Sequence, residues 1–140
     1  MCGIVGLFLK DKSMEPELGT LLTDMLITMT DRGPDSAGIA IYGNKTSKIG
    51  KLTLQSNTPD VDFLNLKSDL AVSLKGSVQI GVKSSHAVLK VKSDQLTEVR
   101  KILKCIRPDI RIMSSGESLE IYKEIGLPKD VAVRFDLKNM

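Results

Sequence analysis

The most regular hydrophobic pattern in the chain predicts a helix near its start. Apolar side chains recur there every three or four residues, which is the spacing of one face of an α-helix. They are Leu18, Leu21, Leu22, Met25, Leu26 and Met29. The pattern stops at Asp31–Ser36, where Gly33 and Pro34 favour a turn.

Short apolar runs on either side of this helix predict strands. Ile4–Leu9 is rich in branched side chains and predicts a strand that is buried on both faces. Ala37–Tyr42 predicts a second strand after the turn. Gly43–Ser47 is typical of a five-residue loop before a third strand over Lys48–Leu54, so we expect the second and third strands to form a hairpin.

The second half of the chain predicts a small α+β module. A weaker helical pattern covers Val61–Leu74 and ends at Gly76. Apolar and polar residues then alternate over Val78–Val82 and again over Ala87–Val91. This alternation predicts two adjacent strands that are buried on one face.

The rest of the module is expected to contain two helices and a strand. Ser93 can cap a helix whose apolar face continues to Ile106. Ile110–Met113 predicts a short strand. Ser114–Glu117 has the spacing of a capping box, which predicts a last helix that ends near Ile125.

Composition excludes several classes of function. The chain has 140 residues, of which 41% are hydrophobic, 4% are aromatic and none is tryptophan, and its net charge is +3. Few aromatic residues and dispersed lysines argue against nucleic-acid binding. No apolar run approaches the roughly 20 residues that cross a bilayer, and the start lacks secretory features. We therefore expect a cytoplasmic protein that binds neither nucleic acid nor membranes.

The residues that could hold a cofactor or metal are sparse. Cys2 and Cys105 stand far apart, which fits neither a disulfide framework nor a metal site. Neither the dinucleotide fingerprint nor the Walker pattern occurs, so we expect no cofactor and no metal. Cys105 is expected to be a small packing residue. His86 is expected to be exposed on a strand, with no catalytic use.

Cys2 is the first candidate for chemistry. Removal of Met1 would leave a thiol and a free α-amine on one residue. An α-amine titrates near ~7.7–8.0 and a thiol near ~8.5, so the amine can accept the thiol proton directly or through a water. Taken alone, the residue favours an inert buried thiol, which is the commoner use of cysteine.

Two segments together resemble the start of a known domain. Cys2–Gly6 and Asp31–Gly38, with a strand and a helix between them, are similar to the class II glutamine amidotransferase domain, an N-terminal-nucleophile hydrolase. The resemblance covers about the first 43 residues. Beyond them it is closest to the amidotransferase subunit related to glutamate synthase and N-methylglutamate synthase.

The resemblance implies a fold, a reaction and three site residues. The fold would be an αββα sandwich of two sheets and two helical layers. Cys2 would attack the side-chain amide of glutamine, form a thioester and release ammonia to a synthase partner. Arg32 and Gly33 match the arginine-glycine turn that supports the nucleophile. A fixed guanidinium beside a thiol favours the thiolate, and glycine permits a close backbone approach.

Later motifs of that domain are missing from the sequence. Its Gly-x-x-His-Thr-Arg segment, His-Asn-Gly segment and downstream aspartate, which hold the oxyanion and the substrate, do not occur. We therefore expect an incomplete sandwich: residues 1–76 as the N-terminal part, 77–127 as an inserted α+β module, and 128–140 as a connection to a missing remainder. The isolated chain would be a poor glutaminase.

Three explanations of this incompleteness stay open: a truncated gene, a split gene, or a subunit completed by another chain. Two other functions also stay open. One is a non-catalytic binding or regulatory module over Val78–Leu127, with Cys2 vestigial. The other is an N-terminal-nucleophile hydrolase that acts on a different amide.

Overall fold

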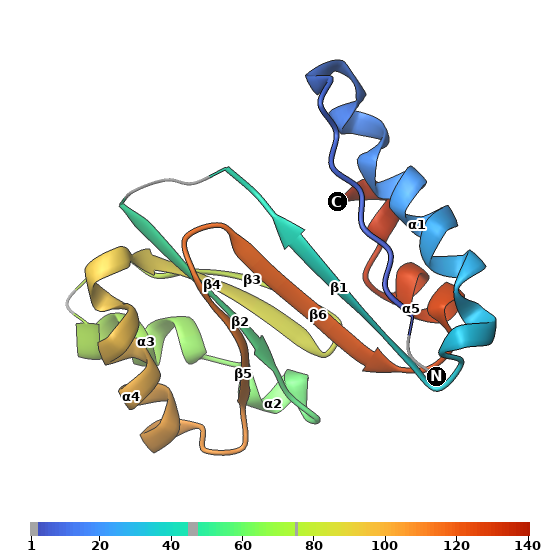
Figure 1. Ribbon diagram of the computed structural model, residues 1–140. Coiled ribbons are helices and arrows are strands. Elements are labelled where there is room, and N and C mark those ends of the chain that lie inside the picture. Colours follow the sequence, from blue (N-terminus) through green and yellow to red (C-terminus); the bar gives the residue numbers. More distant parts are fainter. Residues whose placement is uncertain (1–2, 45–47, 75) are drawn as a thin grey trace. The chain divides into compact units, whose positions relative to one another are not determined.

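The structure is a computed structural model that describes residues 3–44, 48–74 and 76–140 (Figure 1). The chain divides into two compact units, of which unit 1 contains the residues up to Ile39 together with Lys123–Met140. Unit 2 is Ala40–Tyr122. These boundaries fall within two strands. The predicted division at residues 76 and 127 stays a prediction about domains.

Unit 1 is mainly helical. Its described helices are η1 (Lys12–Glu17), α1 (Leu18–Thr28), η2 (Thr30–Arg32), α5 (Pro128–Arg134) and η4 (Leu137–Asn139). The helix predicted from the apolar period is thus confirmed as α1. The final helices were not predicted, yet Phe135 and Leu137 are each only 1% exposed. The end of the chain therefore contributes to the core of this unit.

The predicted strand over Ile4–Leu9 is wrong. The segment has no regular secondary structure, and its backbone makes no hydrogen bond with any described residue. Ile4 is 95% exposed and Phe8 is 86% exposed. A strand needs a neighbouring backbone to satisfy its N–H and C=O groups, and the described residues offer this segment none.

Unit 2 is built on an antiparallel sheet. Its described elements, including the two strands shared with unit 1, are β1 (Ser36–Tyr42), β2 (Ile49–Gln55), α2 (Pro59–Asp62), α3 (Leu66–Leu74), β3 (Gln79–Lys83), β4 (His86–Lys92), η3 (Ser93–Gln95), α4 (Leu96–Ile106), β5 (Arg111–Gly116) and β6 (Leu119–Ile125). Four strands pair in the order β3-β4-β2-β5, and β1 pairs with β6 in a two-stranded sheet.

The predicted hairpin of β1 and β2 is wrong, although both strands exist. β2 pairs with β4 and β5 instead, and β1 pairs with β6. Residues 45–47 of the predicted loop lie outside the described residues. Leu52 and Leu54 are fully buried in β2, so partners on both sides give this strand more burial than an isolated hairpin could provide.

The predicted last helix is also wrong, because Ser114–Glu117 does not cap a helix. β5 continues to Gly116, and Leu119–Ile125 is the strand β6. Branched and aromatic side chains suit a strand, and Ile121, Tyr122 and Ile125 supply them here. Local cap spacing was therefore a weaker signal than strand propensity.

Two further predictions about helices need correction. The single helix over Val61–Leu74 is divided into α2 and α3, and between them Asn65 adopts a left-handed conformation with φ 59°. Ser93 begins η3 but its side chain does not cap the helix, since its buried hydroxyl has no hydrogen-bond partner among the described residues. The helix that follows, α4, is confirmed.

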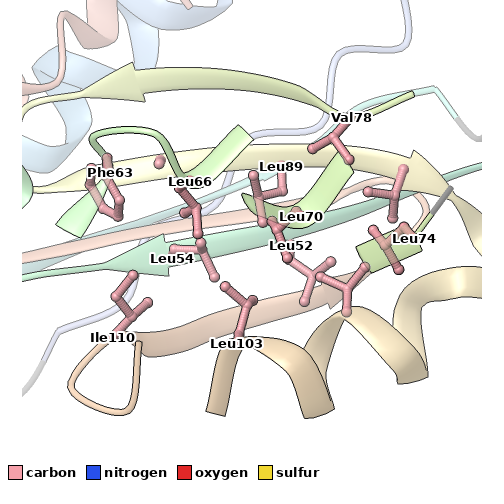
Figure 2. Close-up of a cluster of buried hydrophobic side chains, with 13 residues drawn as sticks. Leu52, Leu54, Phe63, Leu66, Leu70, Leu74, Val78, Leu89, Leu103 and Ile110 are labelled. Carbon is pink, nitrogen blue, oxygen red and sulfur yellow. The ribbon is translucent and has the colours of Figure 1, made fainter. Parts of the chain in front are cut away.

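The core of unit 2 lies between one face of the four-stranded sheet and the helices α3 and α4 (Figure 2). It contains Leu52, Leu54, Phe63, Leu66, Leu70, Leu74, Val78, Ala87, Leu89, Val91, Val99, Leu103 and Ile110. Alternation along β2 and β4 directs Leu52, Leu54 and Leu89 to this face. Their neighbours in sequence therefore lie on the opposite face.

The mixture of helices and antiparallel strands agrees with the α+β class that the sequence predicts. The αββα sandwich stays a prediction. In the part of the chain that the structure describes, none of the helices is long and apolar enough to cross a membrane.

Candidate active site

The turn between α1 and β1 forms the framework of the candidate site. The Arg32 amide donates to the Met29 carbonyl at 3.0 Å, and the Gly33 amide donates to the Thr30 carbonyl at 3.1 Å. These bonds make the short helix η2. After it, the Asp35 carbonyl accepts a hydrogen bond from the Gly126 amide at 2.9 Å. Both ends of the turn are thus held by backbone contacts within unit 1.

Gly3, the first described residue, packs against this turn. A Cβ atom placed on Gly3 would lie 2.3 Å from the Met29 Cε atom and 3.2 Å from the Arg32 Cβ atom. Contacts this close leave no room for a side chain at Gly3 without movement of Met29. The residue that follows Cys2 in sequence therefore lies directly beside Arg32.

A cavity of about 270 Å³ lies beside this contact, within unit 1. It is lined by Gly3, Leu26, Met29, Gly33, Pro34, Asp35, Ser36, Ala37, Gly38 and Pro128. The glycines expose backbone groups, and Asp35 and Ser36 add polar side chains. Such a surface can donate and accept hydrogen bonds around a small polar substrate.

The structure describes two of the three predicted site residues, Arg32 and Gly33. Cys2 lies outside the described residues. Arg32 is exposed and forms no ion pair with a described residue, so Asp35 does not orient it. Gly33 lines the cavity in an extended conformation with φ −163°, which any residue can adopt. The close approach that was expected at Gly33 is found at Gly3, whose backbone lies against the side chains of Met29 and Arg32.

The prediction that His86 is exposed is wrong. His86 is fully buried in β4, its Nδ1 atom lies 3.1 Å from the Ser85 hydroxyl, and its ring centroid lies 5.7 Å from that of Tyr122. The alternation correctly placed His86 opposite Leu89. It could not reveal that β6 covers that face of the sheet too.

The prediction that Cys105 packs in the core is also wrong. The side chain is exposed and the thiol is free. On α4 the fully enclosed positions are Val99 and Leu103, and Cys105 lies outside the narrow stripe that they define. Its exposure makes Cys105 a useful internal reference for the reactivity of Cys2.

A network of charged and polar side chains lies on the face of the four-stranded sheet that β6 covers. Lys51 Nζ lies 2.7 Å from Glu120 Oε1, and the Tyr122 hydroxyl donates to Glu120 Oε2 at 2.8 Å. Burial raises the pKa of Glu120, but the hydrogen bonds and the charges of Lys51 and Lys90 outweigh it, so that pKa lies below its ordinary value. Burial, and then the Glu120 carboxylate, raise the pKa of Tyr122.

Sequence reasoning missed Met29 and Pro128 as residues of the cavity. Met29 belonged to the apolar period of α1, which predicted packing and gave no sign of a cavity wall. Pro128 lies about 90 residues from the rest of the lining, and no local pattern could bring it there. A metal site was not predicted, and the described residues contain no cluster of histidine, cysteine and carboxylate groups that could hold one.

Comparison with known proteins adds to this geometry. The chain is 59% identical over its full length to the "Glutamine amidotransferase-like protein GlxB" of Rhizobium meliloti, of which it covers 46%. It is 26% identical, over 97% of its length, to the "Putative glutamine amidotransferase" of Methanothermobacter thermautotrophicus, of which it covers 47%. No protein-family model matches the chain. The chain therefore spans about half the length of the curated relatives it matches.

Proposed function

We propose that the chain is the nucleophile-bearing part of a glutamine amidotransferase of class II, with Cys2 as the attacking group. The names of the two relatives support the glutamine amidotransferase role. The observation that carries the proposal is the packing of Gly3 against Met29 and Arg32. Gly3 directly follows Cys2 in the sequence, and it lines the candidate cavity.

The chemistry requires Met1 to be removed, so that Cys2 carries its own base. The α-amine takes the thiol proton, and the sulfur attacks the side-chain carbonyl carbon of glutamine. The carbon–nitrogen bond breaks as that proton passes to the leaving nitrogen, which departs as ammonia. A thioester remains on Cys2. Water then cleaves it, releases glutamate and restores the thiol.

Arg32 and Gly33 are proposed to support this reaction from the turn. A guanidinium near a thiol lowers the thiol pKa by favouring the thiolate. Arg32 has no ion-pair partner among the described residues that would neutralise its charge. Gly33 leaves the cavity open beside it, since a Cβ atom there would meet no described atom within 4 Å.

The ammonia is proposed to pass to a synthase partner of the glutamate synthase kind, inside the cytoplasm. The chain covers less than half of each relative, so the residues that hold the oxyanion and the substrate are proposed to come from additional polypeptide. The incomplete αββα sandwich follows from the same proposal. Ile4–Leu9, exposed and unpaired, would then gain strand partners.

A hybrid protein tests the proposal. The 140 residues replace the matched part of the GlxB relative, so that a polypeptide of the relative's full length is present. We expect release of ammonia from glutamine, and mass spectrometry should find a diazoketone analogue of glutamine attached to Cys2. Cys2→Ala should abolish both signals, because it removes the sulfur that forms the thioester in the proposed reaction.

Cys105→Ala is the matched control. Cys105 is exposed and free, so iodoacetamide should label it whether or not glutamine chemistry occurs. The glutamine analogue should spare Cys105, and Cys105→Ala should keep full ammonia release. A folded hybrid that releases no ammonia, or an analogue that labels Cys105 as fast as Cys2, would falsify the proposal.

A further inference from the structure

A groove in unit 2, far in sequence from Cys2, has the features of a binding site. It has a volume of about 340 Å³ and lies on the face of the sheet opposite the hydrophobic core. Its lining residues come from β3, β4 and β6: Gln79, Ile80, Gly81, Val82, Lys83, Val88, Lys90, Glu120 and Tyr122. The volume falls within the range of sites for small molecules.

The register of the sheet explains why the groove is there. Gly81 pairs with Val88, and Val88 pairs in turn with Thr53. β6 covers Thr53, because the Ile121 amide donates to the Thr53 hydroxyl at 3.3 Å. Gly81 has no side chain, and a Cβ atom there would meet nothing within 4 Å. The face is therefore filled over β2 and open over β3.

Positive charge lies at both ends of this opening. Lys83 pairs with His86 at one end, and Lys90 pairs with Gln79 at the other. His86 and Lys90 are four residues apart on β4, which places these ends about 13 Å apart at ~3.3 Å per residue. Neither Lys83 nor Lys90 forms an ion pair with a described residue.

Glu120 does not cancel this positive charge. Lys51 and Lys90 are directly opposite each other on β2 and β4, where like charges repel. Glu120 binds Lys51 through one oxygen and Tyr122 through the other, so both of its carboxylate oxygens already have partners. That end of the groove keeps one net positive charge, and the Lys83 end keeps another.

We propose that this groove binds a small organic dianion whose two carboxylates are joined by a short hydrocarbon chain. The carboxylates contact the Lys83 and Lys90 ammonium groups, whose long side chains reach toward the middle of the groove. The hydrocarbon chain lies over Gly81 and Val88, against the Tyr122 ring. This site is independent of Cys2 and of the reaction proposed for it.

The test is a nuclear magnetic resonance titration of the ¹⁵N-labelled chain with glutarate and, separately, with butyrate. Glutarate has two carboxylates on a short chain, and butyrate has only one. We expect saturable shifts of the Gly81 and Val88 amides, with glutarate binding at least several-fold more tightly. Inorganic phosphate, an anion without a hydrocarbon chain, should produce no saturable shift at these amides.

Three variants and one control variant sharpen the titration. Lys83→Gln and Lys90→Gln should each reduce the affinity for glutarate to that for butyrate, because one carboxylate loses its partner. Gly81→Leu should abolish saturable binding, since a Cβ atom at this position meets nothing within 4 Å and the rest of the side chain would occupy the groove. Lys101→Gln, on the outer surface of α4, should change nothing.

The proposal is overturned if glutarate and butyrate bind equally, if phosphate shifts the same amides to saturation, or if Gly81→Leu still binds. It is also overturned if Lys101→Gln weakens binding as much as Lys83→Gln. The spectrum of each variant reports whether the sheet is intact, so loss of binding and loss of the fold are distinguished.

Discussion

Unit 1 and unit 2 bury their apolar residues in different places: unit 2 along its sheet and the helices that cover it, unit 1 mainly at the end of the chain, where Phe135 and Leu137 are each 1% exposed. In unit 2, Leu52, Leu54, Leu66 and Leu70 have no exposed surface. In unit 1, none of the apolar side chains that predicted α1 is fully buried, and the buried positions of this helix are Gly19 and Thr23. The candidate site thus lies beside a helix whose apolar side chains are only half-buried, while the most deeply buried side chains of unit 1 lie at the end of the chain.

The difference follows from how the backbone N–H and C=O groups of each unit find hydrogen-bond partners. The four strands of unit 2 pair with one another, and α3 and α4 cover their apolar face. Unit 1 contains Ile4–Leu9, an apolar segment with no hydrogen-bonding neighbour among described residues. A catalytic part that needs further strands would show this pattern, which is why the contrast bears on the proposed function.

The largest expected effect is a cavity in the core of unit 2. Leu70→Ala should lower the free energy of unfolding by about 2–5 kcal/mol, because it removes a fully buried side chain between sheet and helix. Ile4→Ala is the counterpart in unit 1 and should change it by less than about 0.5 kcal/mol. Urea unfolding followed by circular dichroism measures both. Equal effects would contradict the contrast between the units.

A smaller effect is expected at the tightest contact of unit 1. A Cβ atom on Gly19 would lie 2.2 Å from the Leu137 carbonyl oxygen, so Gly19→Ala forces η4 away from α1. Alanine favours a helix by about 1 kcal/mol over glycine, but the clash is with backbone. We expect a net loss of about 1–3 kcal/mol in thermal unfolding.

Thr20→Ala is the control for Gly19→Ala. Thr20 is exposed on the same helix, so its replacement changes helix propensity without steric conflict. It should be neutral or slightly stabilising. If Gly19→Ala proved as well tolerated as Thr20→Ala, the end of the chain would not be part of the core of unit 1.

Loss of the half-buried ion pair of Lys51 and Glu120 in unit 2 should have an effect of similar or smaller size. Lys51→Met removes the ion-pair partner of the Glu120 carboxylate and leaves it the Tyr122 hydroxyl as hydrogen-bond donor, so we expect a loss of about 1–3 kcal/mol in urea unfolding. The counterpart in unit 1 is the pair of Arg134 and Glu124, which are 3.5 Å apart. Arg134→Met should cost less than about 1 kcal/mol, because Arg134 is 47% exposed.

The sequence predicted the elements with strong internal periodicity and failed where burial is set by distant partners. The apolar stripe of α1 and the alternation in β3 and β4 were sufficient to predict those elements. For Ile4–Leu9 the pattern was that of a buried strand, but pairing depends on another backbone. For Leu119–Ile125 the spacing of a helix cap led to the prediction of a helix. The segment forms a strand instead, because it pairs with β1.

The candidate site shows the same limit. Asp31–Ser36 predicted the turn, and the motif around Cys2 directed attention to the start of the chain. That Gly3 contacts Met29 and Arg32 could not be predicted, because the contact joins residues about 30 positions apart. The groove of unit 2 was equally hidden, since it depends on the position of β6 over a sheet whose strand order the sequence did not predict.

The smallest expected effect is a dependence of stability on pH that belongs to unit 2. The folded-state pKa of Glu120 lies below its ordinary value of 4.5, so its contribution to stability is complete above that pH. The contribution decreases as pH falls through the folded-state value, because the carboxylate is protonated and releases Lys51. Glu120→Gln should therefore flatten the fall in unfolding free energy below pH 4.5. If the unfolding free energy of Glu120→Gln fell as steeply below pH 4.5 as that of the parent chain, the contacts of Glu120 with Lys51 and Tyr122 would not contribute to the pH dependence.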